Sequence, residues 1–276
     1  MAPAPPNNGF KELEQLFMEQ PEWVGRPLQD SDVENFRQLA MDKARRINAW
    51  VVDYLSPAPE ISPPEMKARR QEIYDCFFRW AECIDVNSGG DYIRGHLQRV
   101  SSLAGFLARA HIIGNQAQYD SYDADSYAED VAKAAALNDI GYLGLPLQLL
   151  TSNDVYARNS PEREIIGAHV DCGRIILTIP GYEEGKDTRV PLARRIAWSH
   201  HWPHRGQFAG VAGIIVGVVD KVDAITSRRG YKAAFSFDKV RAELQPYAEH
   251  EESRPVLDTF FRHEKEIREL CDQLHQ

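Results

Sequence analysis

The sequence predicts an all-α protein. Apolar residues recur at helical spacing along most of the chain, as in Phe10, Leu13 and Phe17 near its start. A serine followed three residues later by a glutamate, the pattern of a helix capping box, occurs at Ser31 and at Ser62. We find no alternating apolar and polar runs joined by hairpin turns, which would indicate antiparallel strands.

The first two helices are predicted over residues 10–19 and from Ser31 towards residue 55. Glu34 completes the capping box of the second helix, and the four prolines of residues 56–64 end it. A third helix begins at Ser62 and carries an aromatic stripe that we interpret as core or interface: Tyr74, Phe77, Phe78 and Trp80.

The middle of the chain contains a predicted helix over residues 86–111 and an exposed, acidic, tyrosine-rich loop over residues 114–130. His96 lies near the edge of the apolar stripe of that helix. A lone histidine in this position is more often a satisfied core residue than a ligand.

An aspartate ends the alanine-rich apolar run over residues 131–137. On a continuous helix, Asn138 and Asp139 would share a face with Val131 and Ala135. A buried carboxylate is costly unless hydrogen-bond donors or a metal ion accompany it. The sequence therefore predicts that Asp139 has one of these partners.

Further helices are predicted in the second half of the chain. One begins at Pro161 and carries His169, and another is opened by Pro191 and carries His200. Residues 213–227 are apolar nearly all round, so periodicity alone allows a strand over part of this range, whereas its length favours a buried helix.

Histidines and aspartates are thus inserted singly into predicted apolar faces. These are the residue types that bind first-row transition metals. The candidate ligands of a metal site are therefore His96, Asp139, His169, His200, His201 and Asp220.

The composition is that of a globular protein with 43% hydrophobic and 26% charged residues. A net charge of −9 argues against a general binder of nucleic-acid polymers or anionic membranes. No apolar run reaches the roughly 18 residues of a membrane span, and residues 1–8 lack signal-peptide character. We expect a cytoplasmic protein whose four scattered cysteines are reduced.

Five segments carry a family resemblance. In order they are 95–100 (GHLQRV), 138–141 (NDIG), 164–169 (EIIGAH), 200–201 (HH) and 219–232 (VDKVDAITSRRGYK). They resemble the HD-GYP family, the bacterial cyclic di-GMP phosphodiesterases of the HD phosphohydrolase superfamily. The resemblance implies an HD-domain helical bundle over residues 88–276. Residues 1–87 would form a helical extension for docking, sensing or homodimerisation.

The resemblance also implies two metal positions that share Asp139. Two metals would make a hydroxide from a bridging water and clamp the phosphate oxygens. One metal set is complete and consists of Asp139, His169, His200 and His201. The other would use His96, Asp139, Asp220 and position 138, where Asn138 offers only a neutral carbonyl oxygen in place of an imidazole. We predict one iron, manganese or zinc ion per chain.

Several departures from the family pattern weaken catalysis. Asn138 replaces the histidine of the His-Asp pair, and Tyr142 replaces a lysine that would place positive charge beside the phosphate. The Gly-Tyr-Pro motif is absent, because residues 202–210 form a shorter loop. Tyr92 occupies the position where some members carry a glutamate for a third metal, so we expect no third metal.

The phosphate-binding end of the family pattern is retained. Arg229 and Lys232 match positions that contact the dinucleotide phosphates, although Gly230 replaces a proline. With Arg205 they would form a cationic rim for an anionic ligand. A solvated basic turn explains the same residues.

Two classes of function therefore remain open. Asn138 and Tyr142 favour a metal-binding module with weak or lost hydrolysis, which binds cyclic di-GMP or a signalling partner such as a diguanylate cyclase domain. The retained metal-binding residues favour the alternative, an active metal-dependent phosphodiesterase or phosphohydrolase acting on cyclic di-GMP or another nucleotide.

Overall fold

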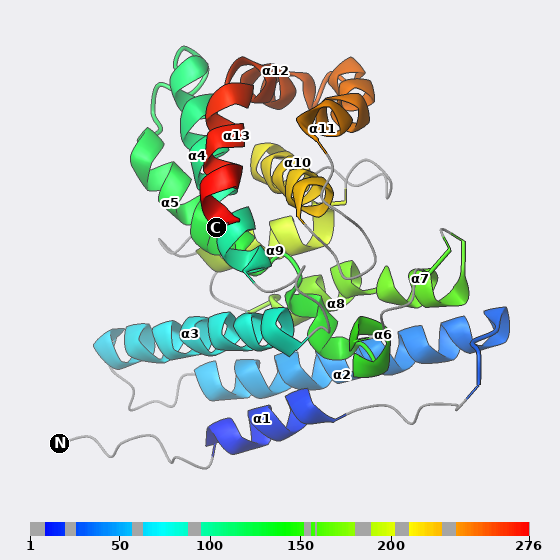
Figure 1. Ribbon diagram of the computed structural model, residues 1–276. Helices are drawn as coiled ribbons and strands as arrows, with labels where there is room; N and C mark the ends of the chain where they lie inside the picture. The colour runs from blue at the N-terminus through cyan, green and yellow to red at the C-terminus, as the bar shows by residue number, and fades with distance from the viewer. Residues whose placement is uncertain are drawn as a thin grey trace.

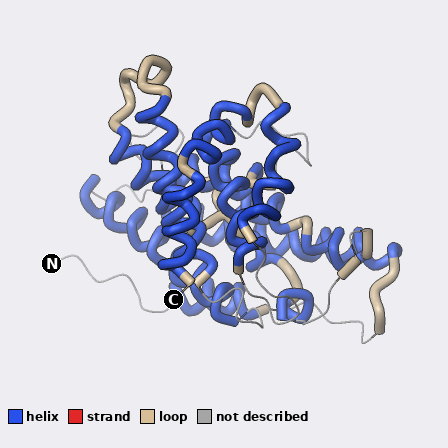
Figure 2. Tube along the Cα trace, turned by 45° about the horizontal axis from the view of Figure 1, so that its top comes forward, coloured by secondary structure: helices blue, strands red, loops and turns tan. Residues whose placement is uncertain are grey.

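The computed structural model describes residues 9–19, 26–56, 63–87, 95–151, 156–157, 159–179, 189–201, 210–227 and 236–275. All regular secondary structure in these ranges is helical (Figure 2), which confirms the predicted class. The elements are α1 (Gly9–Met18), α2 (Asp30–Leu55), α3 (Pro63–Asn87), α4 (His96–Gly114), α5 (Ala124–Ala135), η1 (Ile140–Gly144), α6 (Leu147–Thr151), α7 (Pro161–Ile166), α8 (His169–Ile176), α9 (Arg189–Ser199), α10 (Gly210–Thr226), α11 (Phe237–Leu244), η2 (Gln245–Glu249), α12 (Arg254–Arg262) and α13 (Glu264–Leu274).

The helices form two stacked groups (Figure 1). Helices α1, α2 and α3 lie together at one side, and α4, α5 and α9 to α13 form the other group. Between them, α7, α8 and η1 pack on α2, while α8 also packs against α9. The two groups are therefore joined through α8 and η1.

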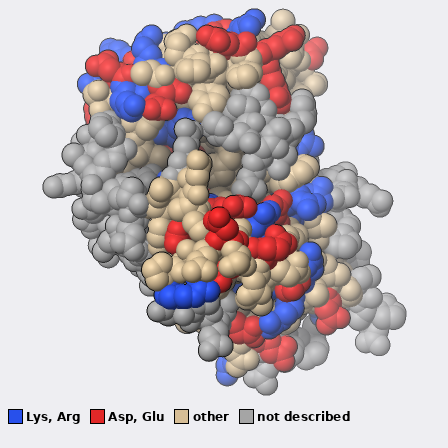
Figure 3. Space-filling model, turned by 90° about the vertical axis from the view of Figure 1, so that its right-hand side faces the viewer, with Lys and Arg blue, Asp and Glu red and all other residues tan. Residues whose placement is uncertain are grey.

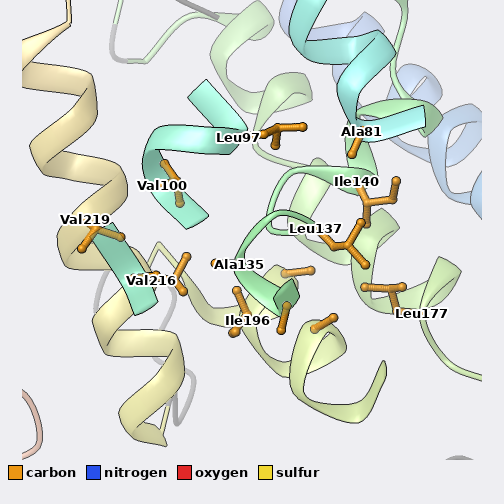
Figure 4. Packing of buried hydrophobic residues seen from close by; sticks show 14 of the residues in the cluster. Ala81, Leu97, Val100, Ala135, Leu137, Ile140, Leu177, Ile196, Val216 and Val219 are labelled. Carbon is orange, nitrogen blue, oxygen red and sulfur yellow. The ribbon is translucent and has the colours of Figure 1, made fainter. Parts of the chain in front are cut away.

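One cluster of buried hydrophobic residues extends through both groups, from α1 to α13. Figure 4 shows Val100 of α4, Leu137, Ile196 of α9 and Val216 of α10 lying around its centre. At the edge of the cluster, the amide of Asn48 on α2 donates to the carbonyls of Ile176, the last residue of α8, and Thr178. The described helices α1 to α3 thus share a core with the rest of the described chain. The role of residues 1–87 in docking or dimerisation stays a prediction.

The aromatic stripe of α3 is largely core, as predicted. Phe77 is fully buried and Tyr74 is 8% exposed. Trp80 is half-buried and packs edge-on against Phe17 of α1, with ring centroids 4.4 Å apart. The Tyr74 hydroxyl donates to the carbonyl of Lys133 at 2.9 Å, which ties α3 to α5.

The capping box of α2 was predicted two residues too late. The helix begins at Asp30, and the Asp32 carboxylate accepts the backbone N–H of Gln29 at 2.8 Å. Arg26 holds that carboxylate from outside the helix at 2.7 Å, so Asp32 takes the role expected for Glu34. The break after Leu55 is confirmed, whereas the capping position Ser62 lies outside the described residues.

The boundaries of α4 and α5 also differ from the prediction. Residues 86 and 87 belong to α3, and α4 begins at His96. The expected loop over residues 114–130 is wrong in its second half, because α5 begins at Ala124. Asp123 caps that helix by accepting the N–H of Ser126 at 2.7 Å. The acidic composition of this stretch suggested a loop, although one of its aspartates is the N-cap of a helix.

Asn138 and Asp139 do not lie on a continuous helix, so that prediction is wrong. Helix α5 ends at Ala135, and residues 136–139 turn into the short helix η1. The helix predicted from Pro161 is also divided, at Gly167, into α7 and α8. Ser160 caps α7 as expected from its sequence, with its hydroxyl accepting from the Arg163 N–H at 3.3 Å.

The apolar stretch 213–227 is a helix, which excludes the strand alternative. It belongs to α10, while α9 begins at Arg189, two residues before the proline expected to open it. Proline is tolerated there because the first helical turn has no internal partner for its N–H. In the part of the chain described, no helix combines the length and apolar character needed to cross a membrane. Cys76, Cys172 and Cys271 are buried free thiols.

Candidate metal centre

Asp139 lies in the turn that joins α5 to η1, with 17% of its side chain exposed. Two residues later, Gly141 allows η1 to approach α8 closely. A Cβ at this glycine would lie 1.8 Å from the carbonyl oxygen of His169, so no other residue fits without movement of the backbone. This close contact places Asp139 beside His169, the first residue of α8.

Gly217 of α10 provides a second close approach. A Cβ there would lie 2.3 Å from the carbonyl oxygen of His200. His200 and His201 directly follow α9, while Asp220 lies one turn after Gly217 on α10. The end of α9 and the middle of α10, which carry these side chains, are therefore held together by backbone packing.

Three histidines form what we call the imidazole-rich group: His169, His200 and His201. The Nε2 atom of His169 lies 3.3 Å from Nε2 of His200 and 3.2 Å from Nε2 of His201. Asp139 Oδ1 lies 3.3 Å from Nε2 of His169 and 3.5 Å from Nε2 of His200. The three imidazoles thus present ring nitrogens to one another within 4.8 Å, a spacing that a single metal ion can span.

Backbone carbonyls fix the orientation of two of these rings. The Nδ1–H of His169 donates to the carbonyl of Ile166 at 2.7 Å. The Nδ1 atom of His200 faces the carbonyls of Ile196 and Ala197, each at 3.2 Å. Since Nδ1 carries the donated proton, a neutral ring directs the lone pair of Nε2 towards Asp139, as a metal-binding histidine requires.

The carboxylate-rich group consists of His96, Asp139 and Asp220. The Nε2 atom of His96 lies 3.6 Å from Asp139 Oδ2 and 3.6 Å from Asp220 Oδ1. Asp139 therefore turns one oxygen towards each group. All the side chains that the sequence predicted as metal ligands come together in this way.

A buried network that the sequence did not predict surrounds the ring of His96. Its Nδ1 atom lies 2.8 Å from Oδ2 of Asp223, which is fully buried on α10. The Arg99 guanidinium donates to both oxygens of Asp223, and the hydroxyl of Ser227 donates to Oδ1 at 2.9 Å. The sequence feature that could have revealed this network is Asp223, the second aspartate of the apolar run, one helical turn after Asp220.

The network shifts the titration of its members. Burial raises the pKa of Asp223, but hydrogen bonds from His96 and Arg99 outweigh it and lower that pKa to about 2. Burial would lower the pKa of His96, yet Asp139 and Asp223 raise it to about 10. In the metal-free protein His96 therefore carries a proton that a bound metal ion would replace.

The pKa shifts of His201 and Asp220 also suit a cation bound between the two ligand groups. Burial holds the pKa of His201 well below its usual value, and the neighbouring His200 lowers it further, so that ring is neutral. Burial raises the pKa of Asp220, and the nearby negative charge of Asp139 adds to the increase. A divalent ion would offset the repulsion between these two carboxylates.

Asn138 is completely buried, and neither atom of its side-chain amide has a hydrogen-bond partner. Buried amides without a partner are rare and indicate a water molecule or an ion at the site. Tyr142 is half-buried and packs against His169, with ring centroids 4.5 Å apart. The residues brought together thus fit a transition metal, since they combine imidazoles and carboxylates.

The predicted phosphate-binding residues Arg205, Arg229 and Lys232 lie outside the described residues, as do Tyr92 and residues 202–209. Their placement is therefore untested. On the face drawn in Figure 3, acidic and basic side chains are intermixed over the described surface. The excess of acidic side chains that gives the net charge of −9 therefore does not form one continuous acidic patch on that face.

Comparison with known proteins gives related sequences. No protein-family model matches the chain. It is 27% identical over 228 residues to a cyclic di-GMP phosphodiesterase of Vibrio cholerae, an alignment covering 79% of this chain and 44% of that protein. It is 28% identical over 185 residues to a cyclic di-GMP phosphodiesterase of Thermotoga maritima, covering 63% of this chain and 45% of that protein.

A third relative, the 3'3'-cGAMP-specific phosphodiesterase 2 of Vibrio cholerae, is 28% identical over an alignment of 158 residues that covers 54% of this chain and 27% of that protein. The chain thus spans less than half the length of each of these curated relatives. These matches confirm the resemblance to HD-GYP phosphodiesterases that the sequence motifs indicate.

Proposed function

We propose that this chain is a metal-binding protein of cyclic di-GMP signalling whose phosphodiesterase activity is weak or lost. The observation that carries the proposal is the position of Asp139, which turns one carboxylate oxygen to each of two groups of ligand side chains. The relatedness to cyclic di-GMP phosphodiesterases supports the choice of ligand.

One transition-metal ion would be held tightly by the imidazole-rich group with Asp139. Such an ion polarises a phosphoryl oxygen and makes a bound water more acidic. The chain itself holds the Nε2 atoms of His169 and His200 in place through backbone carbonyls. In the metal-free protein, hydrogen bonds from His200 and His96 outweigh burial and hold the pKa of Asp139 well below its usual value, so the carboxylate keeps its negative charge.

Weak hydrolysis is supported by the environment of two residues. Position 138, which the resemblance assigns to the carboxylate-rich group, carries a neutral amide in place of an imidazole. Among the described residues, none hydrogen-bonds to that amide to orient it. Tyr142 places an aromatic ring beside His169, where it adds no positive charge at neutral pH. A developing negative charge on phosphate would therefore be poorly stabilised.

Metal analysis of the purified protein is the first test. We expect one tightly held iron, manganese or zinc ion per chain, which His169→Ala abolishes. The matched control is His263→Ala, because this histidine lies at the start of α13 and pairs only with Glu266 among the acidic side chains described. Two tightly held ions, or none after purification without chelator, would contradict the proposal.

The second test separates binding from hydrolysis. We expect cyclic di-GMP to bind, and Arg229→Ala and Lys232→Ala to weaken binding in calorimetry, with the exposed Lys265→Ala as control. Hydrolysis should be slow, because loss of one charge-stabilising group typically lowers the rate by about 10²–10³. Equal affinity in all three variants would place the ligand elsewhere.

The alternative function is an active phosphodiesterase or phosphohydrolase. The observation that favours it is that both ligand groups are assembled around Asp139 although one lacks an imidazole. Turnover within the usual range of about 1–10³ per second would establish it and exclude the first proposal.

A role for residues 1–87 in dimerisation, or in docking a diguanylate cyclase domain, is a separate proposal. Sedimentation of the full chain over a range of concentrations tests the dimer.

A further inference from the structure

The last described residue of the chain reaches the network around His96. His275 caps the C-terminal end of α13, and its Nε2 atom lies 2.9 Å from the hydroxyl oxygen of Ser227. Ser227 is 2% exposed at the end of α10 and contacts Asp223 Oδ1, also at 2.9 Å. A continuous row of hydrogen-bonding groups therefore runs from α13 to the carboxylate-rich group.

The direction of these hydrogen bonds follows from the number of protons. A serine hydroxyl has one proton, and an ionised carboxylate only accepts. Ser227 must therefore donate to Asp223, which leaves its oxygen lone pairs towards His275. The Nε2 atom of His275 then carries a proton, and this N–H donates a hydrogen bond to the oxygen of Ser227.

The same reasoning continues to the metal centre. Asp223 Oδ2 accepts the Nδ1–H of His96, so Nε2 of that ring faces Asp139 and Asp220. Arg99 also donates to Asp223, but it comes from the same helix as His96. Ser227 follows α10, which carries Asp223, and like Arg99 Nε it donates to Oδ1. His275 reaches Ser227 from beyond α13, so a third segment of the chain contributes to the position of the carboxylate.

The packing of α13 gives this row of contacts a rigid support. Ile267 and Cys271 are buried on its inner face, and the helix packs along α4. The side chain of His275 is 27% exposed, so changing it removes little of the core.

We propose that Ser227 and His275 are positioning residues for His96, and that α13 thereby sets the metal affinity of the carboxylate-rich group. The inference rests on the metal site of the proposed function. Neither residue touches the ion or the substrate. Each acts by holding Asp223 in the orientation that aims the His96 ring.

The test uses the full chain with Mn²⁺ as the only probe, titrated to millimolar concentration and followed by the EPR signal of the free ion. We expect Ser227→Ala to weaken the second, weaker Mn²⁺ equivalent by about 10- to 100-fold, the usual effect of removing an outer partner of a metal ligand. His275→Ala should act in the same direction, while the tight equivalent of the imidazole-rich group stays unchanged.

A conservative variant and a control separate positioning from general stability. His275→Gln keeps an N–H donor at nearly the same reach, so it should restore most of the affinity that His275→Ala loses. His263→Ala removes a histidine at the other end of α13, away from Ser227, and should leave both equivalents unchanged. Thermal unfolding of each variant checks that the fold is retained.

A second readout needs no metal. In the metal-free protein, the Nδ1 proton that His96 shares with Asp223 should give a slowly exchanging downfield NMR signal, assigned by its loss in His96→Gln. We expect faster exchange in Ser227→Ala and in His275→Ala. Unchanged Mn²⁺ affinity together with an unchanged ring-proton signal would overturn the proposal. A wild-type chain that binds no Mn²⁺ would contradict the metal site, and the ring proton would still decide the positioning role.

Discussion

The two ligand groups around Asp139 are oriented by different kinds of partner. In the imidazole-rich group, His169 and His200 are held by carbonyls three or four residues earlier in the chain. In the carboxylate-rich group, His96 is held by the side chain of Asp223, 127 positions away. One group thus depends on local helix geometry, and the other depends on a set of distant side chains.

The difference predicts how each group responds to mutation. A carbonyl that orients a histidine cannot be removed by changing a side chain. The imidazole-rich group should therefore be sensitive mainly to mutations that displace the backbone. A network of side chains can lose any one member, and each loss leaves a buried polar group without a partner. We therefore expect substitutions to separate the two groups experimentally.

Asp139→Asn should have the largest effect because Asp139 serves both groups. The amide keeps the shape of the side chain but removes the charge that faces His169 on one oxygen and His96 on the other. We expect both metal equivalents and any hydrolysis to be lost, as measured by metal analysis and a nucleotide assay. The control Asp258→Asn changes an exposed aspartate of α12. Retention of one equivalent would show that the groups do not share this residue.

Gly141→Ala should disrupt the imidazole-rich group through the backbone. The added methyl would lie 1.8 Å from the carbonyl oxygen of His169, so η1 must move away from α8. We expect a loss of about 3 kcal/mol in the free energy of unfolding, as for severe overpacking, together with loss of the tight metal.

The matched control for Gly141 is Gly114→Ala. Its added methyl would meet only the flexible end of Arg262, at 3.1 Å, and alanine is the better residue in a helix. Denaturant unfolding should therefore show the control to be as stable as the wild type, or slightly more stable. If both variants lost the same stability, the close contact of η1 with α8 would not be the cause.

Asp223→Asn should affect the carboxylate-rich group alone. It removes the charge that pairs with the buried guanidinium of Arg99, and breaking a buried ion pair costs about 3–5 kcal/mol. The pKa of Asp223 is lowered to about 2, so the wild-type contribution is present above the ordinary aspartate range and is lost as pH falls towards 2. We expect the stability difference between wild type and variant to shrink on acidification below about pH 4. A difference that stays constant down to pH 2 would exclude the ionised carboxylate as the cause.

The smallest expected effect is a partial repair. The double variant Asn138→His with Tyr142→Lys would return an imidazole to the carboxylate-rich group and a positive charge beside the phosphate. Metal content should rise towards two ions per chain, and hydrolysis of cyclic di-GMP should exceed the sum of the single variants, because both changes act on one reacting group. Twice the metal without more hydrolysis would identify the short loop after His201 as the remaining defect. Unchanged metal content would remove position 138 from the site.

Local signals in the sequence predicted much of the fold. Helical spacing of apolar residues gave the helical class, and the serine before Pro161 gave the start of α7. Where local signals compete, the prediction was wrong. The acidic stretch before α5 was interpreted as a loop although its own aspartate caps a helix, and a continuous helix was extended through residues 136–139, which turn.

Residue type and the family resemblance together named the members of the candidate centre. Histidine and aspartate within apolar stretches need a polar partner wherever the fold places them. The resemblance singled out His96, Asp139, His169, His200, His201 and Asp220 among them. The carbonyls that hold His169 and His200 are equally local, since they lie within one helical turn.

The resemblance already divided these residues into two sets, but only the tertiary structure decided which oxygen of Asp139 faces each set and which partners orient His96. Those contacts join α4, α10 and α13, and they depend on glycines that allow the backbone at Gly141 and Gly217 to approach other segments closely. No local preference encodes such distances, because they result from the packing of a whole core. The sequence therefore determined which groups must be satisfied, and the packing determined by which partner.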